Sequence, residues 1–314
     1  MKEQNYVYAV YEEKSFSKAA KKLFVSQPAL SMTVKKTEEE LGITIFDRST
    51  SPLTLTEEGE IYIRALEEIR SVERSMRERL SDMTNLKSGV VKVSGENFVS
   101  SFIMPPVLMR FAEKYRGIEV ELSESNSPDL RQQLLTESID LLIAHDFDPS
   151  LYTAVRLFEE QVLLAVPEKF PIVRELGKYA FKGEDILEGK HKKKNAPVSD
   201  LSRFREESFL LLKPGNDMHR RGFSLCTEAG FTPKVGIWLD QLITSYNLAR
   251  AGLGVAFVTD VLVRTARGDG CVYFLLSGEG AKRQMSIGYK KNRYVSRAAF
   301  AFLQTAREVY QKND

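Results

Sequence analysis

The sequence is poor in the residues that build disulfides, metal sites and membrane spans. Its 314 residues include two cysteines, Cys226 and Cys271, and three histidines, and none of these is spaced like a set of metal ligands. Two cysteines are too few for a disulfide framework, which favours a reducing compartment. No stretch approaches the roughly 18 consecutive apolar residues that a membrane-spanning helix needs. We therefore expect a protein with no metal, no cofactor and no membrane anchor.

A targeting segment and a strong charge bias are also missing. The first residues, MKEQNYVYAVYEEKSF, have no apolar run and no small-residue cleavage site, so we expect a cytoplasmic protein. The 45 basic and 43 acidic residues leave a net charge of +2, which by itself predicts no partner. With 43% hydrophobic and 28% charged residues, the composition is that of a globular protein. The length exceeds one ordinary core, so we expect two or three domains.

The N-terminal region predicts three short helices. Apolar spacing predicts helices over residues 5–13, 17–23 and about 27–41, with Ser17 and Ser26 as the N-caps of the second and third. The tight turn between the last two helices is typical of a helix-turn-helix.

Proline and glycine mark the limits of the third helix, and a wing follows it. Pro28 suits the first turn, since proline there gives up no hydrogen bond, and Gly42 suits the end. Two β-rich runs, ITIF at 43–46 and PLTLT at 52–56, predict a two-stranded wing. The side chains expected to face inward from the third helix are Ala29, Leu30, Val34 and Leu41.

The charges of this region are ordered along the chain. Between Lys14 and Lys36 there are six lysines and no acidic residue, whereas residues 1–60 as a whole carry eight basic and ten acidic residues. DNA binding therefore requires the acidic run Glu38–Glu40 to lie at the far end of the third helix. At its near end, Gln27 can pair with a base edge, and Ser26 and the free N–H groups of the helix start can donate to phosphates. Ser31 can donate in the same way, and Lys35 is expected to contact a phosphate.

A long amphipathic helix follows the wing. Thr56 is its expected N-cap, and apolar residues recur along it at alternating spacings of four and three, with Glu73 as one polar interruption. This spacing predicts a dimerisation seam, because the opposite face is highly charged; the alternative is a helix that lies on its own domain. The seam residues are Tyr62, Leu66, Ile69, Met76, Leu80 and Met83.

From residue 89 onward, strand-like and helix-like runs alternate with short connections, as in a mainly parallel sheet. The chain leaves one α/β lobe, builds a second and returns. We expect an α+β multidomain protein: a winged helix-turn-helix over 1–58, a linker helix over 59–88 and a two-lobed α/β domain over 89–314. Lobe I should take up about 89–165 and 270–314, and lobe II about 166–269. The basic loop 189–197 is expected to be solvated surface.

Three motifs connect this organisation to a known family. SFSKAAKKLFVSQPALS, EEELGITIFDR and LTLTEEG occur in the order and spacing typical of LysR-type transcriptional regulators, which the chain resembles from residue 5 to about 86. The remainder is similar in layout to that family's effector domain, a two-lobed fold akin to periplasmic solute-binding proteins. The resemblance implies binding of double-stranded DNA and a small effector, pairing of chains through the long helices, and assembly of pairs into tetramers.

The resemblance also implies roles for single residues. Gln27 and Pro28 begin the recognition helix, and Arg48 is placed where a wing arginine approaches DNA. Two positions depart from the pattern: Met32 replaces a cationic or polar DNA-contacting residue, and Thr37 replaces a core leucine. The further expected phosphate or base contacts are Ser26, Ser31 and Thr33.

An effector site between the lobes is implied as well. In such folds ligands lie at strand ends and helix starts, and exposed amides there favour a small organic anion, although Asp240 would repel a carboxylate. The expected effector-binding residues are Asn97, Phe98, Val99, Ser100, Ser125, Ser127, His145, Asn216, Asp240 and Gln241.

Enzyme motifs are weak by comparison. SFSK at 15–18 has the S-x-x-K form of penicillin-binding proteins but lacks the K-T-G and S-D-N elements that accompany it, and AGLGVAF lacks the context of a dinucleotide site. We therefore assign no catalytic residue. The alternative function is a cytoplasmic ligand-binding protein or enzyme whose N-terminal helices serve only for oligomerisation.

Overall fold

The computed structural model describes residues 2–82, 89–125 and 127–311. The chain divides into two compact units, Met1–Leu80 and Ser81–Asp314, each with its own hydrophobic core. In the described part of the chain, no helix has both the length and the apolar character needed to cross a bilayer.

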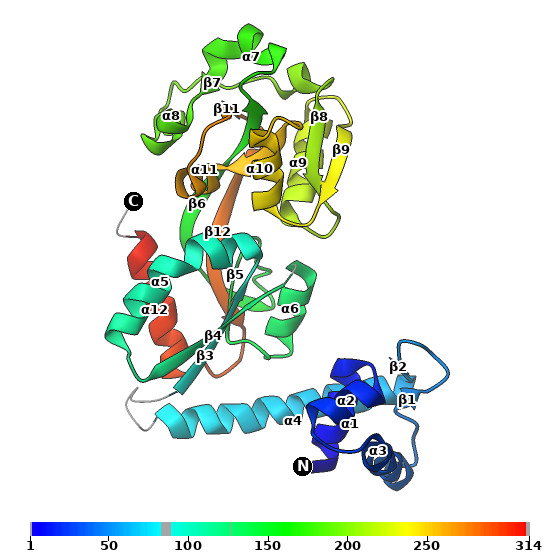
Figure 1. The fold of residues 1–314 in the computed structure, drawn as a ribbon. Coiled ribbons are helices and arrows are strands. Elements are labelled where there is room, and N and C mark those ends of the chain that lie inside the picture. Colours follow the sequence, from blue (N-terminus) through cyan, green and yellow to red (C-terminus); the bar gives the residue numbers. More distant parts are fainter. Residues whose placement is uncertain (1, 83–88, 126, 312–314) are drawn as a thin grey trace. The chain divides into compact units, whose positions relative to one another are not determined.

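The first unit is a winged helix-turn-helix, as predicted (Figure 1). Its wing strands β1 and β2 pair antiparallel, with Phe46 opposite Leu55. Val7, Val10, Leu30, Val34 and Ile45 are completely buried where the first three helices meet. The elements in order are α1 (Lys2–Glu13), α2 (Phe16–Lys22), α3 (Gln27–Leu41), β1 (Phe46–Asp47), β2 (Thr54–Leu55) and α4 (Glu57–Asp82).

Serine caps fix where the short helices begin. Ser26 caps α3 as predicted, its Oγ accepting a hydrogen bond from the Ala29 amide at 3.4 Å. The prediction of Ser17 as the cap of α2 is wrong, because Ser15 caps that helix. The helix starts one residue after Ser15, and Phe16 then lies edge-on against Phe46 at 5.8 Å between ring centroids.

The third helix ends as predicted but buries partly different side chains from those expected. Gly42 ends α3 with φ of 67°, in the left-handed region that glycine adopts without strain. Leu30 and Val34 face the core, whereas Ala29 and Leu41 are exposed, contrary to the prediction. Thr37 is buried, and its Oγ1 donates to the Thr33 carbonyl at 3.1 Å, so its hydroxyl is satisfied inside the helix.

Glu38 ties the end of α3 to the start of the wing. Its side chain is buried, and Oε1 accepts hydrogen bonds from the Ile45 amide at 2.8 Å and the Phe46 amide at 3.3 Å. Its Oε2 lies 2.9 Å from Nη2 of Arg48. The first acid of the run Glu38–Glu40 is thus a structural group, which the charge order alone did not reveal.

The start of α4 is fixed against the strand before it. The predicted cap is present, since Thr56 Oγ1 accepts a hydrogen bond from the Gly59 amide at 2.9 Å. A Cβ on Gly59 would lie 2.0 Å from the Ile45 carbonyl oxygen, so only glycine allows this approach. Leu66 is 2% exposed and packs in the core of the first unit.

The second unit has two lobes built on one continuous sheet of the order β4-β3-β5-β12-β6-β11-β7, with β10 also paired to β6. The first lobe contains β3 (Gly89–Gly95), the π-helical turn η1 (Val99–Ile103), α5 (Met104–Lys114), β4 (Ile118–Glu124), α6 (Ser127–Leu135), β5 (Leu141–Ala144) and the closing helix α12 (Arg297–Gln311).

The second lobe adds a separate parallel pair, β8 and β9. Its elements are α7 (Pro171–Leu176), η2 (Gly177–Tyr179), β7 (Ala180–Phe181), α8 (Gly183–Leu187), η3 (Lys190–Lys192), η4 (Leu201–Phe204), β8 (Ser208–Leu212), α9 (Asp217–Glu228), β9 (Lys234–Leu239), α10 (Leu242–Arg250), β10 (Ala256–Thr259), α11 (Asp260–Ala266), β11 (Cys271–Leu275) and η5 (Glu279–Ala281).

One long strand belongs to both lobes (Figure 1). The first half of β6 (Tyr152–Pro167) pairs with β12 (Lys282–Lys290), and the second half pairs with β10 and β11. A β-bulge at Leu157, opposite the step from Met285 to Ser286, interrupts the alternation of side chains. Because β11 pairs with β7 and the second half of β6, we place it in the second lobe and propose lobe boundaries at 160–161 and 281–282.

The basic loop 189–197 is attached to the second lobe more firmly than a solvated loop. His191 is buried, and its Nε2 lies 3.2 Å from Oδ2 of Asp260, which is itself completely buried. Lys192 Nζ lies 2.9 Å from the same oxygen. Burial alone would raise the pKa of Asp260, but these two cationic or donor groups hold it below its usual value.

Candidate DNA-binding face and effector cleft

The exposed start of α3 carries the predicted base-reading group. Gln27 and Pro28 are exposed and Ser31 is partly exposed on the first turns of the helix. Within the described part of the chain, the side chains of Gln27 and Ser31 have no hydrogen-bond partner. Their donors and acceptors are therefore available to an external partner, together with the backbone N–H of Gln27, since Pro28 has no N–H and Ser26 accepts from the Ala29 amide.

Other predicted contacts are already engaged within the domain. Thr33 Oγ1 donates to the Ala29 carbonyl at 3.0 Å, and Ser26 Oγ serves as the cap of α3. Arg48 pairs with Glu38, and its guanidinium lies 5.1 Å from the ring centroid of Phe16. Because its side chain is 44% exposed, Arg48 keeps a solvent-facing edge.

The six lysines around the turn fall into three groups. Lys22 binds Glu12 at 3.0 Å and Glu13 at 2.9 Å, and these contacts raise its pKa. Lys35 and Lys36 make long, exposed contacts with the acids four residues later, which cost little to break. The lysines for which no acidic partner is found among the described residues are Lys14, Lys18 and Lys21.

The predicted seam of α4 divides into a buried and an exposed part. Tyr62 and Leu66 pack against the core of the first unit, so they support their own domain. Ile69, Met76 and Leu80 are about half exposed. Met83 lies outside the described residues. Ile61 and Val72, which the heptad spacing did not include, are 66% and 70% exposed on the same helix.

Six of the predicted effector-binding residues line one cavity of about 390 Å³ between the lobes. The cavity lies at the carboxyl ends of β3, β4 and β9 and at the starts of α9 and α10, where ligands bind in open α/β sheets. The six residues are Asn97, Phe98, Ser125, Asn216, Asp240 and Gln241.

Most of the polar groups in this cavity hold one another in place. Asn97 Nδ2 donates to Glu124 Oε2 at 3.1 Å, and Asp240 Oδ2 lies 2.9 Å from Lys213 Nζ. Asn216 caps α9 by accepting a hydrogen bond from the Met218 amide. Gln241 precedes α10 without a capping hydrogen bond from its side chain. The first amides of α10 therefore have no side-chain cap from this residue.

The other predicted residues lie deeper in the fold or outside the described residues. Val99 and His145 line a neighbouring cavity of about 20 Å³, too small for an effector. Ser100 is buried, and its Oγ has no hydrogen-bond partner within the described chain. The side chain of Ser127 lies outside the described residues.

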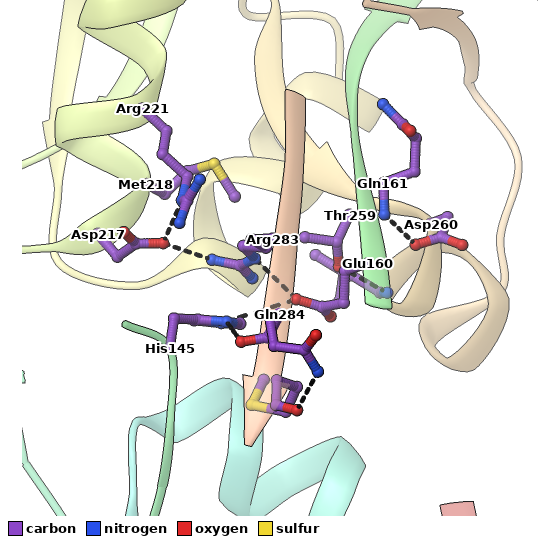
Figure 2. Close-up of polar contacts among 12 residues, drawn as sticks. His145, Glu160, Gln161, Asp217, Met218, Arg221, Thr259, Asp260, Arg283 and Gln284 are labelled. Atoms are coloured by element: carbon purple, nitrogen blue, oxygen red, sulfur yellow. Dashed lines mark hydrogen bonds and ion pairs between the residues drawn. The ribbon is translucent and has the colours of Figure 1, made fainter. Parts of the chain in front are cut away.

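A buried charge network joins the lobes beside the cavity (Figure 2). Arg283 on β12 donates from Nε to Glu160 Oε2 at 2.7 Å and from Nη1 to Asp217 Oδ2 at 3.2 Å. Arg221 on α9 binds Asp217 at 2.7 Å and reaches Asp146 at the end of β5 at 3.0 Å. The network therefore ties α9 of the second lobe to the first lobe.

Burial and neighbouring charges set the protonation of this network. Burial raises the pKa of Glu160, and Arg283 opposes that shift. Burial also acts to raise the pKa of Asp217, but Arg283 and Arg221 outweigh it and lower the value to about 2. Burial, aided by Arg283, lowers the pKa of His145 to about 3. His145 is thus neutral at pH 7, and its Nδ1–H donates to the Gln284 carbonyl at 3.0 Å.

Sequence patterns had not singled out three charged residues of the cavity: Glu96, Glu124 and Arg283. Glu96 and Glu124 follow or end strands β3 and β4, the same signal that identified Asn97 and Ser125. Arg283 was also detectable from the sequence, because it lies on the same face of β12 as the buried residues Met285 and Ile287. An arginine on the buried face of a strand indicates a buried partner.

Two sequence profiles match nearly the whole chain. Residues 1–60 match the bacterial regulatory helix-turn-helix proteins of the lysR family, and residues 84–185 and 186–311 match the LysR substrate binding domain. The uncharacterised HTH-type transcriptional regulator YcgK of Bacillus subtilis is 31% identical, covering 98% of this chain and 94% of its own. The Escherichia coli K12 regulator OxyR is 23% identical over 92% and 89% of the two chains.

Solved structures have the same fold. A full-length OxyR variant from Pseudomonas aeruginosa aligns with a TM-score of 0.69 at 23% identity, covering 98% of this chain and 95% of that one. Full-length CbnR in complex with its target DNA aligns with a TM-score of 0.62 at 19% identity, covering 98% and 99%. The relatives are transcriptional regulators, which does not favour the alternative of an enzyme or a free-standing ligand-binding protein. The chain therefore belongs to the LysR family: it is a DNA-binding transcriptional regulator with an effector-binding domain, not an enzyme.

Proposed function

We propose that this regulator reads its operator with the start of α3, pairs through the exposed part of α4 and responds to a small molecule in the cavity of about 390 Å³. The observation that carries the proposal is the exposed first turn of α3, where Gln27 has no partner in the described chain. The proposed domains are a DNA-binding domain over 1–58, a linker helix over 59–88 and an effector-binding domain over 89–314. We assign the protein to the cytoplasm, because its DNA target lies in that compartment.

The role of Gln27 can be tested with a matched pair of variants. Gln27→Ala should weaken binding to the cognate operator by about 1–3 kcal/mol and relax specificity at one base pair. Gln4→Ala, on α1 of the same domain, should leave binding unchanged. An electrophoretic mobility shift with cognate and random DNA measures both. Equal losses on the two DNAs would contradict base reading by Gln27, and no complex with any DNA at low salt would contradict the proposed function itself.

Pairing through α4 is supported by apolar side chains that the first unit leaves uncovered. Ile61, Ile69, Val72, Met76 and Leu80 are all exposed on this helix. Large apolar side chains in such a row mark a protein–protein contact more often than a solvent-facing helix. Two paired helices would set two recognition helices about one DNA turn, or roughly 34 Å, or a multiple of it apart. In this proposal, two such pairs assemble into a tetramer.

The charge of the cleft bears on the class of effector. Among the described residues, the cavity is lined by the carboxylates of Glu96 and Glu124, by Asp240, which Lys213 pairs, and by the guanidinium of Arg283. Arg283 is already paired with Glu160 and Asp217, so little of its charge is left for a ligand. This lining does not support the expectation of a bare organic anion. We propose instead an effector that carries an ammonium or guanidinium group, held by Glu96 and Glu124.

A thermal-shift screen with the full-length protein tests the effector class. Putrescine and L-lysine should raise the unfolding temperature, whereas succinate and benzoate should not; a ligand at 100 times its dissociation constant adds about 2.7 kcal/mol. Glu124→Gln should abolish the shift. The matched control is Glu121→Gln, because Glu121 lies on the same strand and pairs with Lys92 outside the cavity. Shifts with the anions alone would restore the original expectation.

The two cysteines argue against a thiol-based response. Among the relatives is the hydrogen peroxide-inducible genes activator of Escherichia coli O157:H7. Here Cys226 and Cys271 are both buried, and burial raises the pKa of each thiol to about 12. Since the thiolate is the reactive form, these cysteines do not fit a peroxide sensor.

A further inference from the structure

Met32 is an apolar side chain in the middle of the DNA-binding face. It is 71% exposed on α3, whereas Met104 and Met285 are completely buried in the second unit. Pro28 lies one helical turn before it and Lys35 about one turn after it, so the three share one face of the helix. Met32 therefore contributes little to the core of its own domain, whose buried helix positions are Leu30 and Val34.

The surroundings of Met32 point to DNA as its partner. Lys14, Lys18 and Lys21, which lie before or on α2 of the same helix-turn-helix, have no acidic partner among the described residues, and Lys35 and Lys36 have only weak exposed contacts. An excess of positive charge around an exposed helix start is complementary to phosphates. An apolar protein partner would instead require a wider apolar surface, whereas Met32 lies on this face between the small ring of Pro28 and the cationic Lys35.

The chemistry of methionine limits what Met32 can read in DNA. Its thioether has no donor and is a weak acceptor, so it cannot make the hydrogen-bond pairs by which arginine and glutamine select guanine and adenine. The apolar group that a base pair presents in the major groove is the C5 methyl of thymine. A flexible, polarisable side chain suits such a contact. We infer that Met32 is a specificity determinant that packs against a thymine methyl in each operator half-site; this inference rests on the proposed binding of DNA through α3.

Replacing thymine by deoxyuridine removes this methyl group and nothing else. An operator selected in vitro with the full-length protein would be substituted at one thymine at a time. At one position per half-site the dissociation constant should rise about four-fold, the factor that corresponds to burial of one methyl group. With Met32→Ala, the same substitution should change the dissociation constant by less than two-fold, while deoxyuridine at other thymines acts equally on both proteins. Met109→Ala, which removes an exposed methionine from α5, should behave as wild type.

The outcomes separate this inference from the proposed function. If the protein binds no DNA, binding through α3 fails. If the protein binds its operator but no deoxyuridine substitution loses its effect in Met32→Ala, the assignment of Met32 is overturned and DNA binding stands. A methyl effect that persists in full in Met32→Ala also overturns the assignment, because another side chain then contacts that methyl.

Discussion

Replacing Arg283 by methionine should destabilise the effector-binding domain more than any exposed charge change. The substitution keeps a long apolar stem but removes the guanidinium that lies 2.7 Å from Glu160 and 3.2 Å from Asp217. Glu160 is completely buried, and its Oε1 already lacks a hydrogen-bond partner in the described chain. Removing one partner of a buried ion pair costs about 3–5 kcal/mol, a large part of a typical stability of about 5–15 kcal/mol.

The assay can report on the effector-binding domain alone. Trp238 is the single tryptophan of the chain, and it lies on β9, stacked on Phe223 with a ring-centroid distance of 6.2 Å. Urea unfolding of the full-length protein, followed by tryptophan fluorescence, therefore measures this domain. Arg203→Met is the control: Arg203 lies 3.3 Å from Glu175 with both side chains exposed, so its loss should cost less than about 1 kcal/mol.

Two further results check the physical reason. The double variant Arg283→Met/Glu160→Met should recover most of the lost stability, because no buried charge remains unpaired. The deficit of Arg283→Met should also shrink as the pH falls. Burial raises the pKa of Glu160, so the folded state binds the proton more tightly than the unfolded state, and protonation favours folding. If Arg283→Met had the same free energy of unfolding as Arg203→Met, this reasoning would be refuted.

Three other predictions concern pH, pairing and salt. Because the pKa of His145 is about 3 in the folded protein and about 6.5 when unfolded, wild type should lose about 2–3 kcal/mol more than His145→Gln between pH 6.5 and 4.5, as urea unfolding at both pH values would show. Met76→Glu should halve the mass of the smallest stable species in sedimentation experiments, whereas Arg77→Glu on the charged face should not; an unchanged mass for Met76→Glu would exclude pairing through this part of α4. Lys35→Ala should lower the slope of log K against log salt by about 0.9 on all DNAs, and an unchanged slope would mean that Lys35 contacts no phosphate.

Local signals predicted the N-terminal domain well, because its helix limits depend on neighbouring residues. Ser26 and Gly42 bound α3 as expected, since capping is decided within a few residues. The choice between Ser15 and Ser17 was not local: it depends on where Phe16 meets Phe46, thirty positions later. Leu66 fits a coiled-coil seam equally well by spacing, and only the packed domain shows that it faces its own core.

The cleft could be located but not characterised from the sequence. Strand ends and helix starts identify positions, so six of the predicted residues line one cavity. Which charges remain unpaired there depends on contacts between distant segments, such as Arg283 with Glu160, 123 positions apart. The expected anion site and the observed carboxylate lining differ for this reason.

The bulge at Leu157 determines which face of the sheet each later side chain of β6 occupies. Leu157 and Phe158 are adjacent, yet both are buried, because the extra residue restarts the alternation of faces midway along the strand. Both side chains can thereby join the core of the second unit, with Glu160 facing Arg283 just beyond the bulge. Deleting a single residue here would turn the side chains on one side of the deletion to the opposite face. In evolution, this strand should accept substitutions far more readily than changes of length.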